Sequence, residues 1–417
     1  MFIHGWEKNY KKVSINMKQD KKIPIYYAWF IIFALSTQIL NIKSQGIDSI
    51  VKLGVIIVLI IKIVQANYIK YVDSNALIYI MILLFSELLI IVMGNDGIIT
   101  VVQDFVIVCL LIYLLYTRPR NTLHISETDI YKFYKIYVCF ILVSCIYNMI
   151  IHFNSLRHIT SLTIYGAEDI CSFFDNKNTY GVFLLFGVLA ATILWINTKE
   201  YRWGIFLGIF VINELMAMCR TAIIISLILT IIAMLVDDKH KLRNAFCIII
   251  CIGVFLIILK RNETFHMYIF NSLFGNTSSM DSRNDYINRL LPYATGKHLW
   301  CGYGNTGATQ LAINVMGNRY YHNTYLKLLM EGGVIRILLQ VEMLLLSLYY
   351  GIQVYRVKKG EGALCLLSTT VYVVYSCVES VVLFDTPVVA MMATIFVISM
   401  PILFYNALMK NEDEEDE

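Results

Sequence analysis

Long apolar runs dominate this chain and constrain its fold more than any other feature. Hydrophobic residues make up 58% of the 417 residues and charged residues only 15%, whereas a soluble domain is about 45–50% apolar and about 25% charged. The excess falls in runs of roughly 16–22 residues, the length with which a helix crosses a hydrocarbon core of about 30 Å. A helix also satisfies its own backbone polar groups, as lipid requires. The sequence therefore predicts an all-α polytopic membrane protein.

The apolar runs predict about twelve transmembrane helices. The stretch 203–236 is too long for one helix, and we divide it at Arg220 because an arginine at the centre of a bilayer costs about 2.5–3.5 kcal/mol. The predicted spans are 23–42, 47–67, 76–94, 98–116, 132–153, 179–197, 203–219, 220–236, 245–260, 334–355, 363–384 and 387–408.

Basic residues predict how these spans are oriented. Lysines and arginines gather in residues 1–22 and in alternate short loops, for example at Arg118, Arg202 and Arg356, and such clusters stay in the cytoplasm. The polar segment 1–22 does not fit a cleavable signal peptide. The chain should therefore comprise a basic cytoplasmic N-terminus (1–22), helices one to nine (23–260), an extracytoplasmic loop (261–333) expected to carry the chemistry, helices ten to twelve (334–408) and an acidic cytoplasmic tail (409–417).

Charge and cysteine content exclude several classes of partner. The net charge of +4 follows from the predicted topology and gives no reason to expect a nucleic-acid partner. The cysteines form no pairs with the spacing of a metal site, so no metal is expected. Cys171 and Cys301 both fall outside the membrane in this topology, which leaves a disulfide between them open.

Two short helices are predicted inside the long loop. Ser282 is followed three residues later by an acid, Asp285, as at a helix N-terminus, and Pro292 should end that helix. Asn323 should cap a second helix, Thr324–Glu331, which Gly332 and Gly333 end.

The loop also contains Gly302-Tyr-Gly-Asn-Thr-Gly307, a match to the dinucleotide-binding pattern. That function requires a preceding strand and access from the cytoplasm, and this segment has neither in the predicted topology. We interpret the glycines as a tight turn, and a backbone nest that faces a phosphate remains open.

His322 is the most distinctive polar residue of the loop. It lies next to a predicted helix N-terminus, whose dipole disfavours a protonated ring, so it can accept a proton as a general base. Tyr320, Tyr321, Asn323 and Tyr325 surround it in sequence, and aromatic and amide groups together suit sugar recognition. The alternative is that a single loop histidine is incidental.

Three arginines are candidates for an anion site. Arg220 lies at the external end of a helix pair, where it either binds an anion or merely reaches the lipid headgroups. Arg283 and Arg289 lie on the first loop helix, where they are either solvated or, because a guanidinium fork matches phosphate oxygens, ligands of a diphosphate.

Four features, in their order along the chain, resemble the bacterial O-antigen ligase and Wzy-type polysaccharide polymerase superfamily. The resemblance covers about residues 170–340. Two positions depart from the pattern: Cys219 stands where the family often has serine or glycine, and Arg336 where a glycine is common. The four features are Asp175-Asn-Lys-Asn-Thr-Tyr-Gly181, Cys219-Arg-Thr-Ala222, Arg283 early in the long loop, and His322-Asn-x-Tyr-Leu-x-x-x-x-Glu331-x-Gly at its end.

The resemblance implies glycosyl transfer at the outer face of the plasma membrane, without metal or nucleotide cofactor. The donor would be an oligosaccharide on undecaprenyl diphosphate, held among membrane lipids. Arg220 and Arg283 would stabilise the leaving diphosphate, His322 would assist the acceptor hydroxyl, and the anomeric configuration would invert. The predicted substrate-binding residues are Asn178, Arg289, Asn323, Tyr325 and Glu331.

Several functions remain open at this point. A polymerase would extend one lipid-linked repeat chain onto another, with a chain-length regulator and a flippase as conceivable partners, whereas a ligase would pass the glycan to a lipid-core or protein acceptor. A transporter or flippase is a different class, but the chain shows no paired halves of the transporter type. A membrane-bound acyltransferase is a more distant alternative.

Overall fold

The computed structural model describes residues 127–161, 167, 169–236, 241–273, 278–383 and 388–415, together with positions 81, 85 and 88. Nearly all of these residues are helical, and none of them lies in a β-strand, which confirms the all-α prediction. The predicted N-terminus 1–22, the spans 23–42, 47–67 and 98–116, and all but three positions of 76–94 lie outside the described residues.

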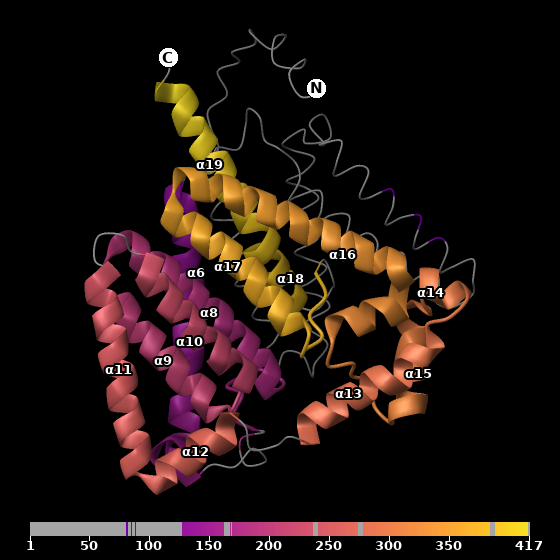
Figure 1. Cartoon of the computed structure of the whole chain (residues 1–417), viewed down its shortest axis with the longest axis horizontal. Coiled ribbons are helices and arrows are strands. Elements are labelled where there is room, and N and C mark those ends of the chain that lie inside the picture. The colour runs from indigo at the N-terminus through magenta and orange to yellow at the C-terminus, as the bar shows by residue number, and fades with distance from the viewer. Residues whose placement is uncertain are drawn as a thin grey trace.

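Seventeen helical elements follow one another in the described ranges (Figure 1). The labels η2 and η3 mark 3-10 turns, and η4 marks a π-helical segment. The elements are α6 Glu127–Ile151, α7 Phe153–Arg157, η2 Ile159–Ser161, α8 Lys177–Thr198, α9 Tyr201–Met216, α10 Arg220–Val236, α11 Lys241–Arg261, α12 Glu263–Leu273, α13 Ser278–Leu290, η3 Leu291–Tyr293, α14 Lys297–Cys301, α15 Gly304–Met316, α16 Thr324–Val357, α17 Lys359–Ser376, α18 Val388–Thr394, η4 Ile395–Ser399 and α19 Met400–Glu415.

Most of the predicted spans that fall on described residues coincide with helices. The division of 203–236 is confirmed, because α9 ends at Met216 and α10 begins at Arg220, with left-handed backbone at Met218 (φ 50°) between them. Within the described ranges, two helices are long and apolar enough to cross a membrane, Ile130–Ile151 and Lys177–Thr198, and two shorter apolar helices are Arg220–Ile232 and Met392–Tyr405. The total of twelve spans stays a prediction.

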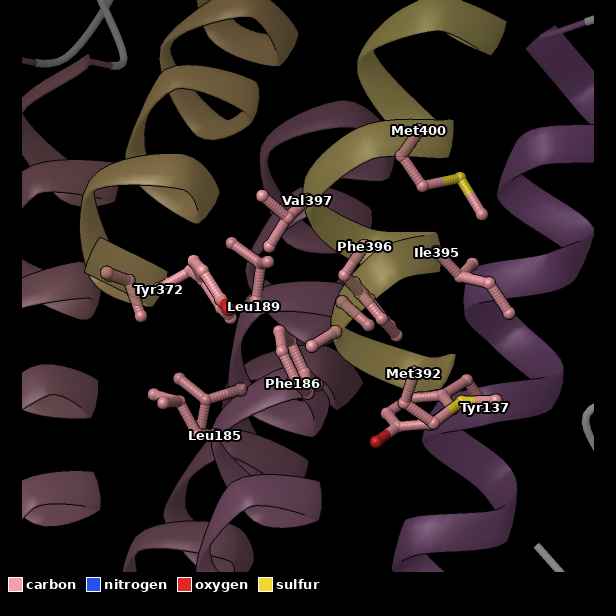
Figure 2. Packing of buried hydrophobic residues seen from close by; sticks show 14 of the residues in the cluster. Tyr137, Leu185, Phe186, Leu189, Tyr372, Met392, Ile395, Phe396, Val397 and Met400 are labelled. Carbon is pink, nitrogen blue, oxygen red and sulfur yellow. The ribbon is translucent and has the colours of Figure 1, made fainter. Parts of the chain in front are cut away.

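Helix α8 lies at the centre of the helix bundle. Every residue from Tyr180 to Leu194 is buried, and α6, α9, α10, α17 and α18 pack around it. Leu185, Phe186 and Leu189 of α8 lie between Tyr372 of α17 and η4 (Figure 2). The rings of Phe186 and Phe396 stack with centroids 4.8 Å apart. Because α8 is enclosed in this way, the polar residues at its first turn occupy a fixed position at one end of the bundle.

The segment between α11 and α16 has a small hydrophobic core of its own. Helices α13, α14 and α15 gather around the first turns of α16, away from α9 and α11 (Figure 1). Tyr286, Leu290, Ala308, Tyr321 and Met330 are among the buried residues of this core. Helices α13, α14 and α15 therefore form the region that presents the start of α16, whereas α12 contributes Tyr268 and Ile269 to a separate cluster. Helices α12, α14 and α15 were not predicted from the sequence.

The two loop helices that were predicted differ in their ends. The cap prediction at Ser282 is wrong, since α13 already begins at Ser278, although the helix does end just before Pro292, which lies in η3. The cap at Asn323 is confirmed, because its Oδ1 accepts a hydrogen bond of 2.9 Å from the amide of Leu326. Gly333 is not helical (φ 68°, ψ −163°) and separates two helices within α16, so the predicted end at Gly332 and Gly333 is confirmed, and the second helix runs on to Val357.

The predicted span 363–384 is wrong at its second end. Helix α17 stops at Ser376, and residues 377–383 are not helical. After the last turn of α17, backbone groups of this segment hydrogen-bond to α16: Thr324 Oγ1 donates to the carbonyl of Glu379 at 2.8 Å and accepts from the amide of Val381 at 2.9 Å. Glu379 therefore belongs to a connection beside the start of α16.

Candidate functional site

His322 lies two residues before the start of α16, and its ring contacts two tyrosines. The ring of Tyr286, on α13, meets it edge-on with centroids 5.6 Å apart, and the ring of Tyr320 lies at 6.1 Å. The histidine side chain is 32% exposed. The ring is thus fixed by its neighbours and still reachable from outside the protein.

The backbone at His322 is left-handed, with φ 50°, which is uncommon for a residue with a side chain. The residues on either side of His322, Tyr321 and Asn323, have fixed contacts that require this left-handed backbone. Tyr321 is buried and donates a 2.6 Å hydrogen bond to the carbonyl of Ala308, and Asn323 must cap α16. Burial holds the pKa of Tyr321 well above its ordinary value, so this side chain stays a neutral donor. Backbone of this kind costs about 1–3 kcal/mol and is concentrated at functional sites.

Glu379 joins His322 to Asn178. One carboxylate oxygen, Oε2, lies 3.7 Å from His322 Nδ1, and the other, Oε1, accepts a hydrogen bond of 3.2 Å from Asn178 Nδ2. Asn178 is 201 residues away from Glu379 in sequence and occupies the first turn of α8. The structure therefore brings together two predicted site residues, Asn178 and His322, through a third residue that was not predicted.

Glu379 was missed because it fell inside the predicted span 363–384. One signal could have found it: a carboxylate is costly inside lipid and needs a partner there, and Glu379 is close to the end of the apolar run. The structure fixes its backbone as well as its carboxylate. Asn323 Nδ2 donates to the carbonyl of Cys377 at 3.0 Å, and Thr324 binds the next turn of the connection as described above.

Arg220 is the first residue of α10 and directly follows the turn between α9 and α10, at the same end of the bundle as Asn178. The turn is held against α8 by Cys219, whose Sγ donates to the carbonyl of Lys177 at 2.9 Å. Gly181 makes this approach feasible, because a Cβ there would lie 2.8 Å from the same sulfur. Cys219 is within electrostatic range of both Lys177 and Glu379. The turn therefore places Arg220, which is half-buried, near the first turn of α8.

Helix α13 carries the other two arginines. Arg283 precedes Tyr286, whose ring contacts His322, by three residues and Leu290 by seven. Arg289 lies on a different face, where its Nε donates to Asp285 Oδ1 at 2.9 Å and both side chains are exposed. Arg283 therefore shares a helix face with Leu290 of the small core, about a third of a turn from Arg289.

The remaining predicted site residues lie along the first turns of α16. Tyr325 is half-buried, and burial together with the nearby Cys377 raises its pKa to about 12. Glu331 forms an ion pair with Lys327, with Nζ and Oε1 3.7 Å apart. The structure thus places Tyr325 close to the 377–383 connection and Glu331 nearer to the kink.

The glycine-rich segment Gly302–Gly307 serves backbone packing. It follows a helix, α14, and no strand, so it lacks the context of a dinucleotide site. Gly302 has φ 67°, and a Cβ there would collide with the backbone of Glu331. The amide of Tyr303 donates to the carbonyl of Met330 at 2.7 Å. The predicted tight turn is confirmed, and its function is to let this chain segment cross α16.

The two departures from the family pattern are both accommodated. Cys219 keeps a hydrogen-bond donor where a serine would have one. The side chain of Arg336 occupies the space that a Cβ on Gly332 would need, so the kinked helix packs around it.

Cys171 and Cys301 are both free thiols, so the structure contains no disulfide between them. In the part of the chain that the structure describes, no cluster of three or more histidine, cysteine or acidic residues could hold a metal ion.

Comparison with known proteins gives a match over part of the chain. A search of curated proteins finds none that is similar to this chain. A family model described as O-antigen ligase matches residues 177–341, about two-fifths of the chain. The match begins one residue before Asn178 and includes Arg220, Arg283 and His322, whereas Glu379 lies beyond its end. Residues 177–341 are therefore similar to the O-antigen ligase family, which is consistent with the resemblance to the O-antigen ligase and Wzy-type polymerase superfamily.

Proposed function

We propose that this protein is a glycosyltransferase that polymerises lipid-linked glycan repeats at the outer face of the plasma membrane. The observation that carries the proposal is the position of His322. It is a fixed, partly exposed histidine inside an O-antigen ligase domain, next to Asn178 and Glu379. Two helices able to cross a membrane support a membrane location. The multi-pass topology with both termini in the cytoplasm is part of the proposal.

The proposed reaction is one displacement at the anomeric carbon of the donor. An acceptor hydroxyl attacks that carbon and gives its proton to His322, while the bond from the carbon to the diphosphate oxygen breaks and the diphosphate leaves with the electron pair. Attack opposite to the leaving group inverts the anomeric configuration. Negative charge develops on the diphosphate in the transition state, so cationic groups that bind it there accelerate the reaction. We assign this role to Arg220 and Arg283.

We propose that Asn178, Asn323 and Tyr325 contact the sugars, with Arg289 and Glu331 at the margins of the site. The donor class is an oligosaccharide on undecaprenyl diphosphate. A ligase that passes the glycan to a lipid-core or protein acceptor would use the same residues. We favour the polymerase, but the features of the site are common to both reactions.

Purified protein tests the proposal when it is given lipid-linked oligosaccharide extracted from cells that lack it. A polymerase makes a ladder of products from this donor alone. A single transfer that requires a second acceptor would instead establish the ligase. No transfer, together with movement of the lipid-linked glycan across vesicles, would establish a flippase.

The arginine assignment is tested in the same assay. Arg220→Lys and Arg283→Lys keep the positive charge but lose the planar fork that binds two phosphate oxygens. We expect each to lower kcat at least tenfold. Arg356→Lys, at the exposed C-terminal end of α16, is the matched control and should keep full activity. Equal rates for all three variants would contradict the assignment.

A further inference from the structure

We propose that Glu379 is a positioning residue that orients His322 and stabilises its protonated form during the transfer. The inference rests on the proposed function. It assigns a role to a residue that lies outside the family match, which ends at residue 341, and that only the fold brings to the site.

The first argument is the geometry of the carboxylate. Glu379 is largely buried, with 14% of its side chain exposed, and Oε2 lies 3.7 Å from His322 Nδ1. This distance is longer than a hydrogen bond of about 2.7–3.2 Å but suits a pair that tightens when charge appears on the ring. Asn178 occupies the other oxygen, so Oε2 is the one directed at the histidine.

The second argument concerns which nitrogen of the His322 ring can accept a proton. With Nδ1 facing Glu379, Nε2 is the nitrogen that can accept the proton of the acceptor hydroxyl. The ring then becomes a cation, and a carboxylate beside Nδ1 stabilises that cation without taking the proton itself. The carboxylate therefore acts most strongly in the transition state, where it lowers the barrier.

The third argument is that the backbones of both residues are fixed to the same helix end. Asn323 and Thr324, the two residues after His322, bind the carbonyls of Cys377 and Glu379. The titratable groups that face the histidine ring in the described structure are Glu379 from the connection after α17, Tyr286 from α13, and Tyr320. Among these three, the carboxylate is the group suited to stabilise an imidazolium.

A purely structural role is the alternative, because Glu379 also links α8 to the connection through Asn178. A double-mutant cycle separates the two roles. Purified wild type, Glu379→Gln, His322→Ala and the double variant are assayed with lipid-linked oligosaccharide extracted from cells that lack the protein. Glu379→Gln removes the charge but preserves the shape and a partner for Asn178. Glu361→Gln, which changes a carboxylate that links α17 to Tyr131 of α6, is the control and should keep its kcat.

We expect Glu379→Gln to lower kcat about tenfold or more, since general-base catalysis contributes roughly 10²–10⁴-fold, with the KM for the donor within twofold of wild type. In the His322→Ala background the same change should cause no further loss. Equal losses in both backgrounds would show that Glu379 acts independently of the histidine and would overturn the inference. A His322→Ala variant with full activity would refute the assignment of the base, and wild-type protein that transfers no glycan would instead refute the proposed function itself.

Restoring the negative charge gives a second test, which does not require measurable activity in the His322→Ala variant. Glu379→Asp keeps the negative charge on a shorter side chain, so it should retain a higher kcat than Glu379→Gln at similar thermal stability. A glutamine variant as active as the aspartate variant, or more active, would overturn the inference.

Discussion

The buried hydroxyl of Thr324 accepts a hydrogen bond of 2.9 Å from the amide of Val381, 57 residues later in the chain. The same hydroxyl donates to the carbonyl of Glu379 at 2.8 Å. One side chain at the start of α16 therefore fixes the connection after α17, and with it the carboxylate beside His322. This arrangement also explains why α17 ends earlier than its hydropathy suggests.

Thr324→Val should destabilise the protein and weaken the site. Valine has nearly the shape of threonine but leaves the Val381 amide without its partner, and a buried unsatisfied amide costs about 1–3 kcal/mol. We expect a lower unfolding temperature in detergent and reduced transfer. Thr370→Val is the control, because Thr370 is exposed on α17 and bonds only to the carbonyl of Leu366 one turn back. If the two variants unfold at the same temperature, the hydrogen bonds of Thr324 to the connection do not contribute to stability.

Gly302→Ala should disrupt the crossing between the loop and α16. Its backbone has φ 67°, and the added Cβ would collide with the backbone of Glu331. Gly317→Ala isolates the cost of backbone strain, about 1–2 kcal/mol, since Gly317 has φ 74° but open space around it. Limited proteolysis between α11 and α16 should cut Gly302→Ala much faster than Gly317→Ala. Similar rates would mean that the close approach contributes little.

Cys219→Ser should retain activity, whereas Cys219→Ala should lose part of it. Serine keeps a donor toward the carbonyl of Lys177, and alanine removes the hydrogen bond that holds the Arg220 turn against α8. A hydrogen bond of this kind contributes about 0.5–1.5 kcal/mol, so the effect on stability should be small and the effect on kcat larger. Equal kcat values for the two variants would show that this contact does not position Arg220.

Alkaline stability should depend on Tyr325. Its folded pKa is raised to about 12 from 10.0, chiefly by burial. The unfolded state therefore loses its proton first as pH rises, and stability present below pH 10 is lost between pH 10 and 12. Tyr325→Phe removes this contribution and should raise the pH at which the protein unfolds. Tyr201→Phe, at a side chain that is 82% exposed, should leave that pH unchanged; a shift as large as that of Tyr325→Phe would contradict the assignment.

The sequence was most informative where one physical requirement dominated. Apolar runs predicted the helices of the bundle, and the cost of a buried arginine located the break at Arg220. Asn323 was identified as a cap because few side chains can satisfy a helix N-terminus. The family motifs also marked Asn178 and His322, although nothing in their spacing showed that the two lie close together.

The rest depended on contacts between segments far apart in the chain. The end of α17 was misplaced because Val381 and its neighbours find hydrogen-bond partners on Thr324, which no local pattern reveals. Glu379 was hidden for the same reason. The start of α13 at Ser278 was missed because the capping pattern at Ser282 competes with several polar residues before it.

The most direct test of the proposed chemistry is the length profile of the glycan made by cells that carry His322→Ala at normal protein levels. His266→Ala, which changes an exposed histidine on α12, is the matched control and should leave the profile unchanged. We predict that His322→Ala abolishes long glycan chains and that single lipid-linked repeats accumulate. An unchanged length distribution in the His322→Ala cells would contradict the assignment of this histidine as the base for glycosyl transfer.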